Sequence, residues 1–139
     1  MIKLCYKEYP FKISLKACKV FYDNTGLDLQ TVFMKYIAVC HKTAGMELTE
    51  RLVFFSELYT RDIASKALHA VIDAETDGVP LSEIEDGTFR VSWIQSTRDD
   101  DISEPWPMVM LDTAIQINDY FANNINVKKS DTVADSQKG

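Results

Sequence analysis

A histidine and two acidic residues near position 70 are the side chains best suited to metal chemistry. His69 and Asp73 are four residues apart and Glu75 follows, so a helix would present His69 and Asp73 on one side. A protein metal site needs three or four converging ligands. Because His69 lies beside an apolar stripe, we interpret it as a surface or boundary histidine. His41, the other histidine, ends a predicted helix, where its imidazolium would complement the helix dipole.

A run of three aspartates, Asp99, Asp100 and Asp101, is the second candidate for chemistry. It lacks the alternating oxygen ligands, central glycine and distal glutamate of a calcium-binding loop. Together with His69 and Asp73 it supports one hypothesis, a metal-dependent hydrolase. However, the sequence contains none of the patterns G-x-S-x-G, G-x-x-x-x-G-K, G-x-G-x-x-G or H-E-x-x-H, which mark common nucleophile, phosphate and zinc sites. We therefore predict that the protein is not an enzyme and needs no cofactor or metal.

Length, charge and cysteine content exclude several classes of protein. The 139 residues suit one globular domain, and 46% apolar with 26% charged residues is an ordinary composition for such a domain. The net charge of -6 argues against binding to nucleic acid or to anionic membranes. Three cysteines without a C-x-x-C motif indicate neither a disulfide framework nor a zinc site. No signal peptide is apparent, and no apolar run approaches the roughly 20 residues that span a bilayer, so we expect a cytoplasmic protein.

The first fifteen residues alternate between apolar and polar side chains, which predicts a β-hairpin over residues 2–15. A loop at residues 7–10 would bring the apolar residues of the two strands together on one face. A two-stranded hairpin is marginal in water, so helices must cover this face. The predicted pairs are Ile2 with Leu15, Leu4 with Ile13, and Tyr6 with Phe11.

Apolar residues then recur at helical spacing, which predicts a helical body over residues 16–124. Gly26 suits the left-handed position that ends a first helix, and Asp28 suits the N-cap of the second. Thr49 is the predicted N-cap of a third helix, with Leu48 and Val53 as its hydrophobic staple. The second helix has the apolar positions Leu29, Val32, Phe33, Tyr36, Ile37 and Cys40. A further stripe before Asp77-Gly78 consists of Ile63, Ala64, Ala67, Leu68, Val71 and Ile72.

Residues 82–94 fit two structures. Ser82 and Glu85 form a capping box that favours a helix, whereas Asp86-Gly87 and the alternation that follows favour a hairpin. We predict the helix. Residues 96–104 have no periodicity and indicate an acidic loop.

The last predicted helix begins at Pro107 and reaches about Asn124. After it, hydrophobicity falls, and residues 126–139 are predicted to be a disordered tail. The predicted fold class is mainly α, with an N-terminal β-hairpin followed by a bundle of about five to six helices. It forms one globular domain over residues 1–125. The apolar stripe of the last helix contains Met110, Leu111, Ala114, Ile115, Ile117 and Phe121.

Several apolar side chains are hard to bury in a compact domain. Val53, Phe54 and Phe55 are consecutive, so at least one must leave the core face of a helix. Trp106 lies between two prolines beside the acidic loop, and Met108 follows it. These residues either form a lid over the core or anchor another chain, because rigid aromatic groups and flexible methionines are typical of chain-binding grooves. The predicted partner-binding residues are Phe54, Phe55, Trp106, Met108, Asp99, Asp100 and Asp101.

Charge is distributed unevenly along the chain. Residues 1–22 hold five lysines and one glutamate, whereas residues 73–104 hold ten acidic residues and two arginines. One interpretation is that charged, solvated faces keep the protein in solution. The other is complementarity to a partner, or to a second copy in a homo-oligomer joined basic end to acidic end. A salt-dependent association constant would distinguish them.

The order of these elements resembles the tail assembly chaperones of long-tailed bacteriophages. The resemblance covers roughly residues 2–95 and rests on a short hairpin, the segment Phe11–Tyr22 leading to Thr25-Gly26-Leu27-Asp28-Leu29, and an all-helical body. The Thr-Gly-Leu step is its most specific local feature. Members of this family are small, acidic, mostly α-helical cytoplasmic proteins, which is the class expected above.

The resemblance implies a non-enzymatic role in tail assembly. Family members bind the long, helical tape measure protein before tail tube subunits enclose it, and they are absent from the finished virion. It therefore implies binding to a tape measure protein, with the major tail tube protein as a further partner, in the host bacterial cytoplasm. The alternative is a small acidic adaptor, of the immunity or antitoxin type, that masks a basic partner in one tight, salt-dependent complex.

Overall fold

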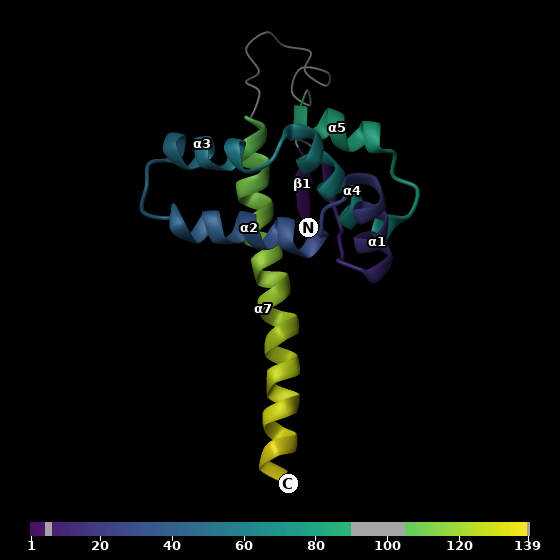
Figure 1. Cartoon of the computed structure of the whole chain (residues 1–139), viewed down its shortest axis with the longest axis vertical. Helices are drawn as coiled ribbons and strands as arrows, with labels where there is room; N and C mark the ends of the chain where they lie inside the picture. Colours follow the sequence, from purple (N-terminus) through teal and green to yellow (C-terminus); the bar gives the residue numbers. More distant parts are fainter. Residues whose placement is uncertain (5–6, 90–104, 139) are drawn as a thin grey trace.

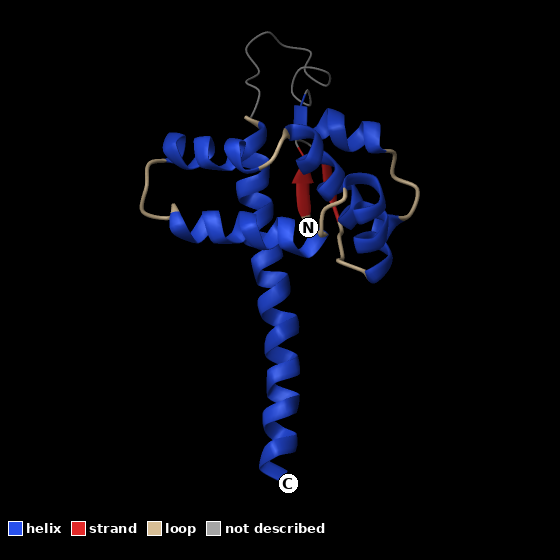
Figure 2. Cartoon of the chain, viewed as in Figure 1, coloured by secondary structure: helices blue, strands red, loops and turns tan. Residues whose placement is uncertain are grey.

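The computed structural model describes residues 1–4, 7–89 and 105–138, and within them the chain is mainly helical (Figure 1). About three quarters of the chain, 74%, is helix, preceded by a two-stranded antiparallel hairpin, so the predicted fold class is confirmed (Figure 2). The elements of the described segments are β1 (Ile2–Leu4), β2 (Lys7–Tyr9), α1 (Leu15–Thr25), α2 (Leu29–Lys42), α3 (Leu48–Leu58), α4 (Arg61–Thr76), α5 (Leu81–Phe89) and α7 (Trp106–Lys138).

The hairpin is shorter than predicted, and its register differs. Ile2 pairs with Tyr9 and Leu4 with Lys7, whereas the sequence predicted pairing of residues 2–6 with 11–15. The second predicted strand is wrong because Pro10 has no N–H to donate to a ladder and Ser14 caps a helix. The Ser14 hydroxyl accepts the Ala17 N–H at 3.1 Å. Of the predicted pairs, Leu15 lies in α1 with 88% of its surface exposed, while Tyr6 lies outside the described residues.

The caps of the first two helices confirm the sequence analysis. Gly26 ends α1 in the left-handed conformation with φ of 73°, and its N–H donates to the Tyr22 carbonyl at 2.7 Å. The Asp28 carboxylate begins α2 by accepting the Thr31 N–H at 2.9 Å. Most residues of the predicted stripes of α2 and α4 are buried, whereas Ile37, Cys40 and Ile63 are only partly buried.

The start of α3 was predicted incorrectly. Glu47, not Thr49, occupies the N-cap position, and no side chain accepts a hydrogen bond there. About half of the surface of Leu48 and of Val53 is exposed, so these two residues do not form a staple. Arg51 instead fixes the turn between α2 and α3, because its guanidinium donates to the Cys40 carbonyl at 3.2 Å and to the buried Thr43 hydroxyl at 3.3 Å.

Loss of this guanidinium should loosen the α2–α3 turn. We expect Arg51→Met to lower the free energy of unfolding by about 1–3 kcal/mol, because the buried Thr43 hydroxyl and the Cys40 carbonyl lose their charged donor. Urea denaturation followed by circular dichroism measures this difference. Lys42→Met, which removes an exposed cation from the same turn, is the control and should change the free energy by less than about 0.5 kcal/mol. Equal effects of the two substitutions would contradict the role of Arg51.

The core lies where α7 crosses α2 and α3 (Figure 1). The helix also packs against β1, while α1 and α5 pack on α4. Nearly every described element contributes buried large side chains to this core, among them Ile2, Phe21, Phe33, Phe55, Leu68 and Ile117. The last helix in the sequence is therefore the central helix of the fold.

Helix α7 matches its predicted start but not its predicted end. Pro107 lies in the first turn, and Val109, Met110, Leu111, Ala114 and Ile117 are buried. Ile115 was placed in the apolar stripe, yet 47% of its surface is exposed. Beyond Asn124 the backbone continues as helix to Lys138, where a disordered tail was predicted. The sequence holds no glycine or proline between Pro107 and Lys138 to stop it, and each further residue adds one helical hydrogen bond.

Glu83 connects the hairpin to α5. Its carboxylate accepts the Tyr9 hydroxyl at 2.7 Å and lies 3.4 Å from the Lys7 ammonium. The hydrogen bond from Tyr9 is the main cause that lowers the pKa of the Glu83 carboxyl below its usual 4.5, and the charge of Lys7 adds to it against the opposing effect of burial. Burial, together with the Glu83 carboxylate, raises the pKa of the Tyr9 phenol.

This contact should make stability depend on pH in acid. A carboxyl whose pKa is lower in the folded state contributes fully above its unfolded pKa and loses the contribution as pH falls through the folded value. We expect Glu83→Gln to cost about 1 kcal/mol at neutral pH and progressively less below pH 4.5. Urea midpoints measured over a pH series check this, with Glu57→Gln on exposed surface as the control. A cost for Glu83→Gln that stays constant into acid would contradict it.

Candidate protein-interaction surface

The structure separates the aromatic residues that the sequence predicted as anchors. Phe54 points outward from α3 with 40% of its surface exposed, whereas Phe55 is fully buried. The Phe55 ring stacks on Tyr36 with centroids 5.8 Å apart, and burial raises the pKa of the Tyr36 phenol. Phe55 therefore belongs to the core and has no surface to offer a partner, which corrects its predicted role.

Trp106 and Met108 begin α7 and are half-buried. Trp106 packs against the edge of the core, and the Arg61 guanidinium lies 6.0 Å from its ring centroid. Trp106 is therefore one of the partly buried side chains packed on the core, and part of each of these two side chains is accessible. Asp99, Asp100 and Asp101 lie outside the described residues.

A groove that sequence analysis missed lies between α2 and α7. Its volume is about 590 Å³. Met34, with 52% of its surface exposed, and Ile37 contribute apolar side chains from α2, and Phe121 contributes one from α7. The described residues that line it are Ile13, Gln30, Met34, Ile37, Asn118, Tyr120, Phe121 and Asn124.

Among the residues whose side chains the structure describes, the groove lining carries no charged group. Side-chain amides of Gln30, Asn118 and Asn124 accompany the apolar groups. The Tyr120 ring is fixed by packing, with its centroid 5.6 Å from that of Phe11 and 6.0 Å from that of Phe121. Residues 30, 34 and 37 follow helical spacing on the outer side of α2, and this pattern is the sequence signal that could have indicated the groove. An uncharged, partly apolar groove between two helices is suited to hold the apolar side of a third.

Comparisons of the chain with protein-family models, with curated proteins and with solved structures find no match. The interpretation of the surface therefore depends on its own geometry and chemistry.

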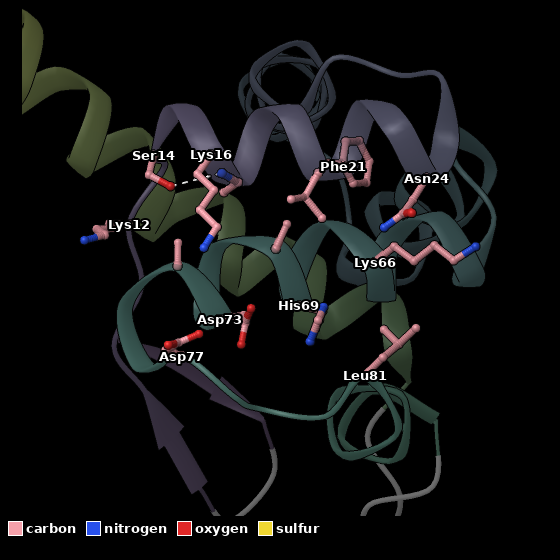
Figure 3. A pocket seen from close by; sticks show the side chains of 14 residues that line it. Lys12, Ser14, Lys16, Phe21, Asn24, Lys66, His69, Asp73, Asp77 and Leu81 are labelled. Atoms are coloured by element: carbon pink, nitrogen blue, oxygen red, sulfur yellow. Dashed lines mark hydrogen bonds between the residues drawn. The ribbon is translucent and has the colours of Figure 1, made fainter.

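A second hollow, of about 470 Å³, lies between α1 and α4 and contains the histidine considered for metal chemistry (Figure 3). Nε2 of His69 lies 2.6 Å from the Val79 carbonyl oxygen, and the Asp73 carboxylate accepts the N–H groups of Gly78 and Val79 at 2.8 and 3.1 Å. Both side chains thus hold the segment that connects α4 to α5. Among the described residues, no three histidine, cysteine or acidic side chains gather closely enough to hold a metal ion.

Two of the three lysines that line this hollow form ion pairs. Lys12 lies 4.0 Å from Glu75, and Lys66 lies 3.0 Å from Asp62. Cations and carboxylates therefore mix at its rim, in contrast to the uncharged groove between α2 and α7. Over the described part of the chain, no helix has the length and apolar character needed to cross a membrane.

Proposed function

We propose that this protein is a non-enzymatic tail assembly chaperone of a long-tailed bacteriophage, which binds the tape measure protein in the groove between α2 and α7. The observation that carries the proposal is the groove itself, with its uncharged lining and the half-exposed side chain of Met34. A groove of this kind holds an amphipathic helix by its apolar side. The order of hairpin and helices supports the same family.

The chemistry of the proposed partner fits the groove. A tape measure protein is long and helical, and before assembly its apolar stripes would aggregate if left in water. Met34 is flexible and polarisable, so it can pack against stripes of different sequence. The amides of Gln30, Asn118 and Asn124 can hydrogen-bond to polar groups beside such a stripe.

The remaining surface suits a temporary complex. A net charge of -6 keeps the chaperone and its bound segment in solution. Several weak contacts along one long partner hold it by avidity and still allow release when the major tail tube protein competes for the same segments. The protein then acts in the host bacterial cytoplasm and does not remain in the mature virion.

Co-expression with the tape measure protein tests this proposal. We expect the wild-type chain to increase the soluble fraction of the tape measure protein, and Met34→Glu to weaken the complex about tenfold or more, because a carboxylate would be desolvated in the groove. Ile115→Glu is the matched control, since Ile115 is also an apolar residue with about half of its surface exposed but lies outside the groove. Pull-down of the tape measure protein measures both variants.

Two results would overturn the proposal. One is a tape measure protein that stays insoluble with the wild-type chain. The other is a tight complex that Met34→Glu does not weaken and that dissociates when salt is added. This result would favour the small acidic adaptor instead.

A further inference from the structure

The outer face of α3 combines exposed apolar and acidic side chains. Glu50, Val53 and Glu57 follow helical spacing on the side opposite the buried Phe55, and Phe54 lies beside them. Val53 is 49% exposed and Phe54 is 40% exposed. Helix α3 contributes no cation to this face, since its one basic residue, Arg51, reaches back to the turn after α2. We call Glu50, Val53, Phe54 and Glu57 the α3 face.

The outer face of α1 combines exposed apolar and basic side chains. Leu15, Lys19 and Tyr22 follow helical spacing, and Leu15 and Tyr22 are 88% and 60% exposed. Lys16 is exposed at the edge of this face, and its side chain points into the hollow between α1 and α4 (Figure 3). The last turn adds one acidic residue, Asp23. We call Leu15, Lys16, Lys19 and Tyr22 the α1 face.

These two faces cannot meet within one molecule. Helix α3 extends to one side of α7, and α1 lies on the other (Figure 1). Within the described part of the chain, the lysines of the α1 face and the glutamates of the α3 face make no ion pair. We propose that the α3 face of one copy binds the α1 face of a second copy, head to tail.

The chemistry of the two faces matches. Phe54 and Val53 can pack against Leu15 and Tyr22, while Glu50 and Glu57 lie within reach of lysines such as Lys19. Each helix has eleven residues and is about 16 Å long, so the contact is smaller than a stable dimer requires. The association is therefore weak, reversible and sensitive to salt. Because two different faces are joined, it forms a chain or a ring rather than a closed twofold dimer.

Charge reversal on each face tests the contact in the purified full-length chain. The first variant is Glu50→Lys with Glu57→Lys, and the second is Lys16→Glu with Lys19→Glu. Each variant presents like charges on both faces, so we expect either alone to lose at least about tenfold in self-association. An equimolar mixture of the two variants places opposite charges at each contact between unlike copies, so association should be regained. Analytical ultracentrifugation over a concentration series, at about 50 mM and about 500 mM salt, measures the average mass.

A control variant separates this effect from that of net charge. Glu8→Lys with Asp119→Lys changes net charge as much as the α3-face variant does, at exposed positions on β2 and α7. It should associate like the wild type. A wild-type chain that stays monomeric throughout the series, or variants that associate like the wild type, would overturn the inference. The test needs no partner protein, and Met34→Glu should self-associate like the wild type. A failure of this inference can therefore be distinguished from a failure of the proposed function.

Discussion

Replacing Phe55 by alanine should remove most of the stability of the protein, while the same change at Phe54 should hardly alter it. Phe55 is fully buried, with its ring stacked on Tyr36, and Tyr59 packs on the same Tyr36 ring at 5.7 Å. Removing a buried phenylalanine leaves a cavity that typically costs about 3–5 kcal/mol. The whole free energy of unfolding of a small domain is about 5–15 kcal/mol. We expect Phe54→Ala to cost about 1 kcal/mol or less, because its side chain is partly in solvent already.

Urea denaturation of the two variants measures this contrast. Phe55→Leu serves as a milder control, since it keeps most of the buried volume and should cost less than Phe55→Ala. Similar losses of unfolding free energy for Phe54→Ala and Phe55→Ala would contradict an orientation of α3 in which Phe55 faces the core and Phe54 faces solvent. The two variants also distinguish an effect on the core from an effect on self-association, because Phe54 belongs to the α3 face and Phe55 does not.

Removing α7 should have the largest effect of all. A chain that ends after Pro105 lacks four large buried side chains, Val109, Met110, Leu111 and Ile117. Each contributes about 1.5–3 kcal/mol by burial, so their loss removes on the order of 6–12 kcal/mol, which matches the whole stability of many domains. We expect this shortened chain to be unfolded and to aggregate.

A chain that ends after Asn124 is the matched control. It keeps every buried residue of α7 that the structure describes, and its midpoint in urea should stay close to that of the full chain. Its circular dichroism also reports on the removed segment, since helical signal is lost only where helix existed. A point substitution repeats the comparison: Ile117→Asp should unfold the protein, whereas Ile115→Asp, at a half-exposed position two residues away, should not. A folded product ending at Pro105 would contradict the central place of α7.

Much of the helical body could be predicted from the sequence because its signals are local. The stripe of α2, the Asp28 cap and the glycine after α1 each depend on residues within a few positions of one another, and the structure confirms them. The hairpin register could not be predicted as well. Alternation continued past Pro10, but the cap formed by Ser14 started a helix and ended the pairing at Tyr9.

Which side of a helix faces the core depends on distant elements. Phe54 and Phe55 are equivalent in the sequence, and packing of α3 on α2 and α7, including the contact of Phe55 with Tyr36, decides that Phe55 is the buried one. The same holds for Ile115, which fits an apolar stripe but lies on the open side of α7. The groove was missed for a related reason, because Met34 and Tyr120 belong to no predicted stripe and meet only in the fold.

The central place of α7 has a consequence for how the protein is made. The ribosome releases β1 and helices α1 to α5 before it releases the helix on which β1, α2 and α3 pack. Until residue 117 has emerged, the inner faces of β1, α2 and α3 lack the apolar surface that α7 provides, and the nascent chain is a target for cellular chaperones and proteases. Folding thus waits until α7 has been translated, and we expect premature termination before α7 to yield fragments that are degraded rather than partly active protein.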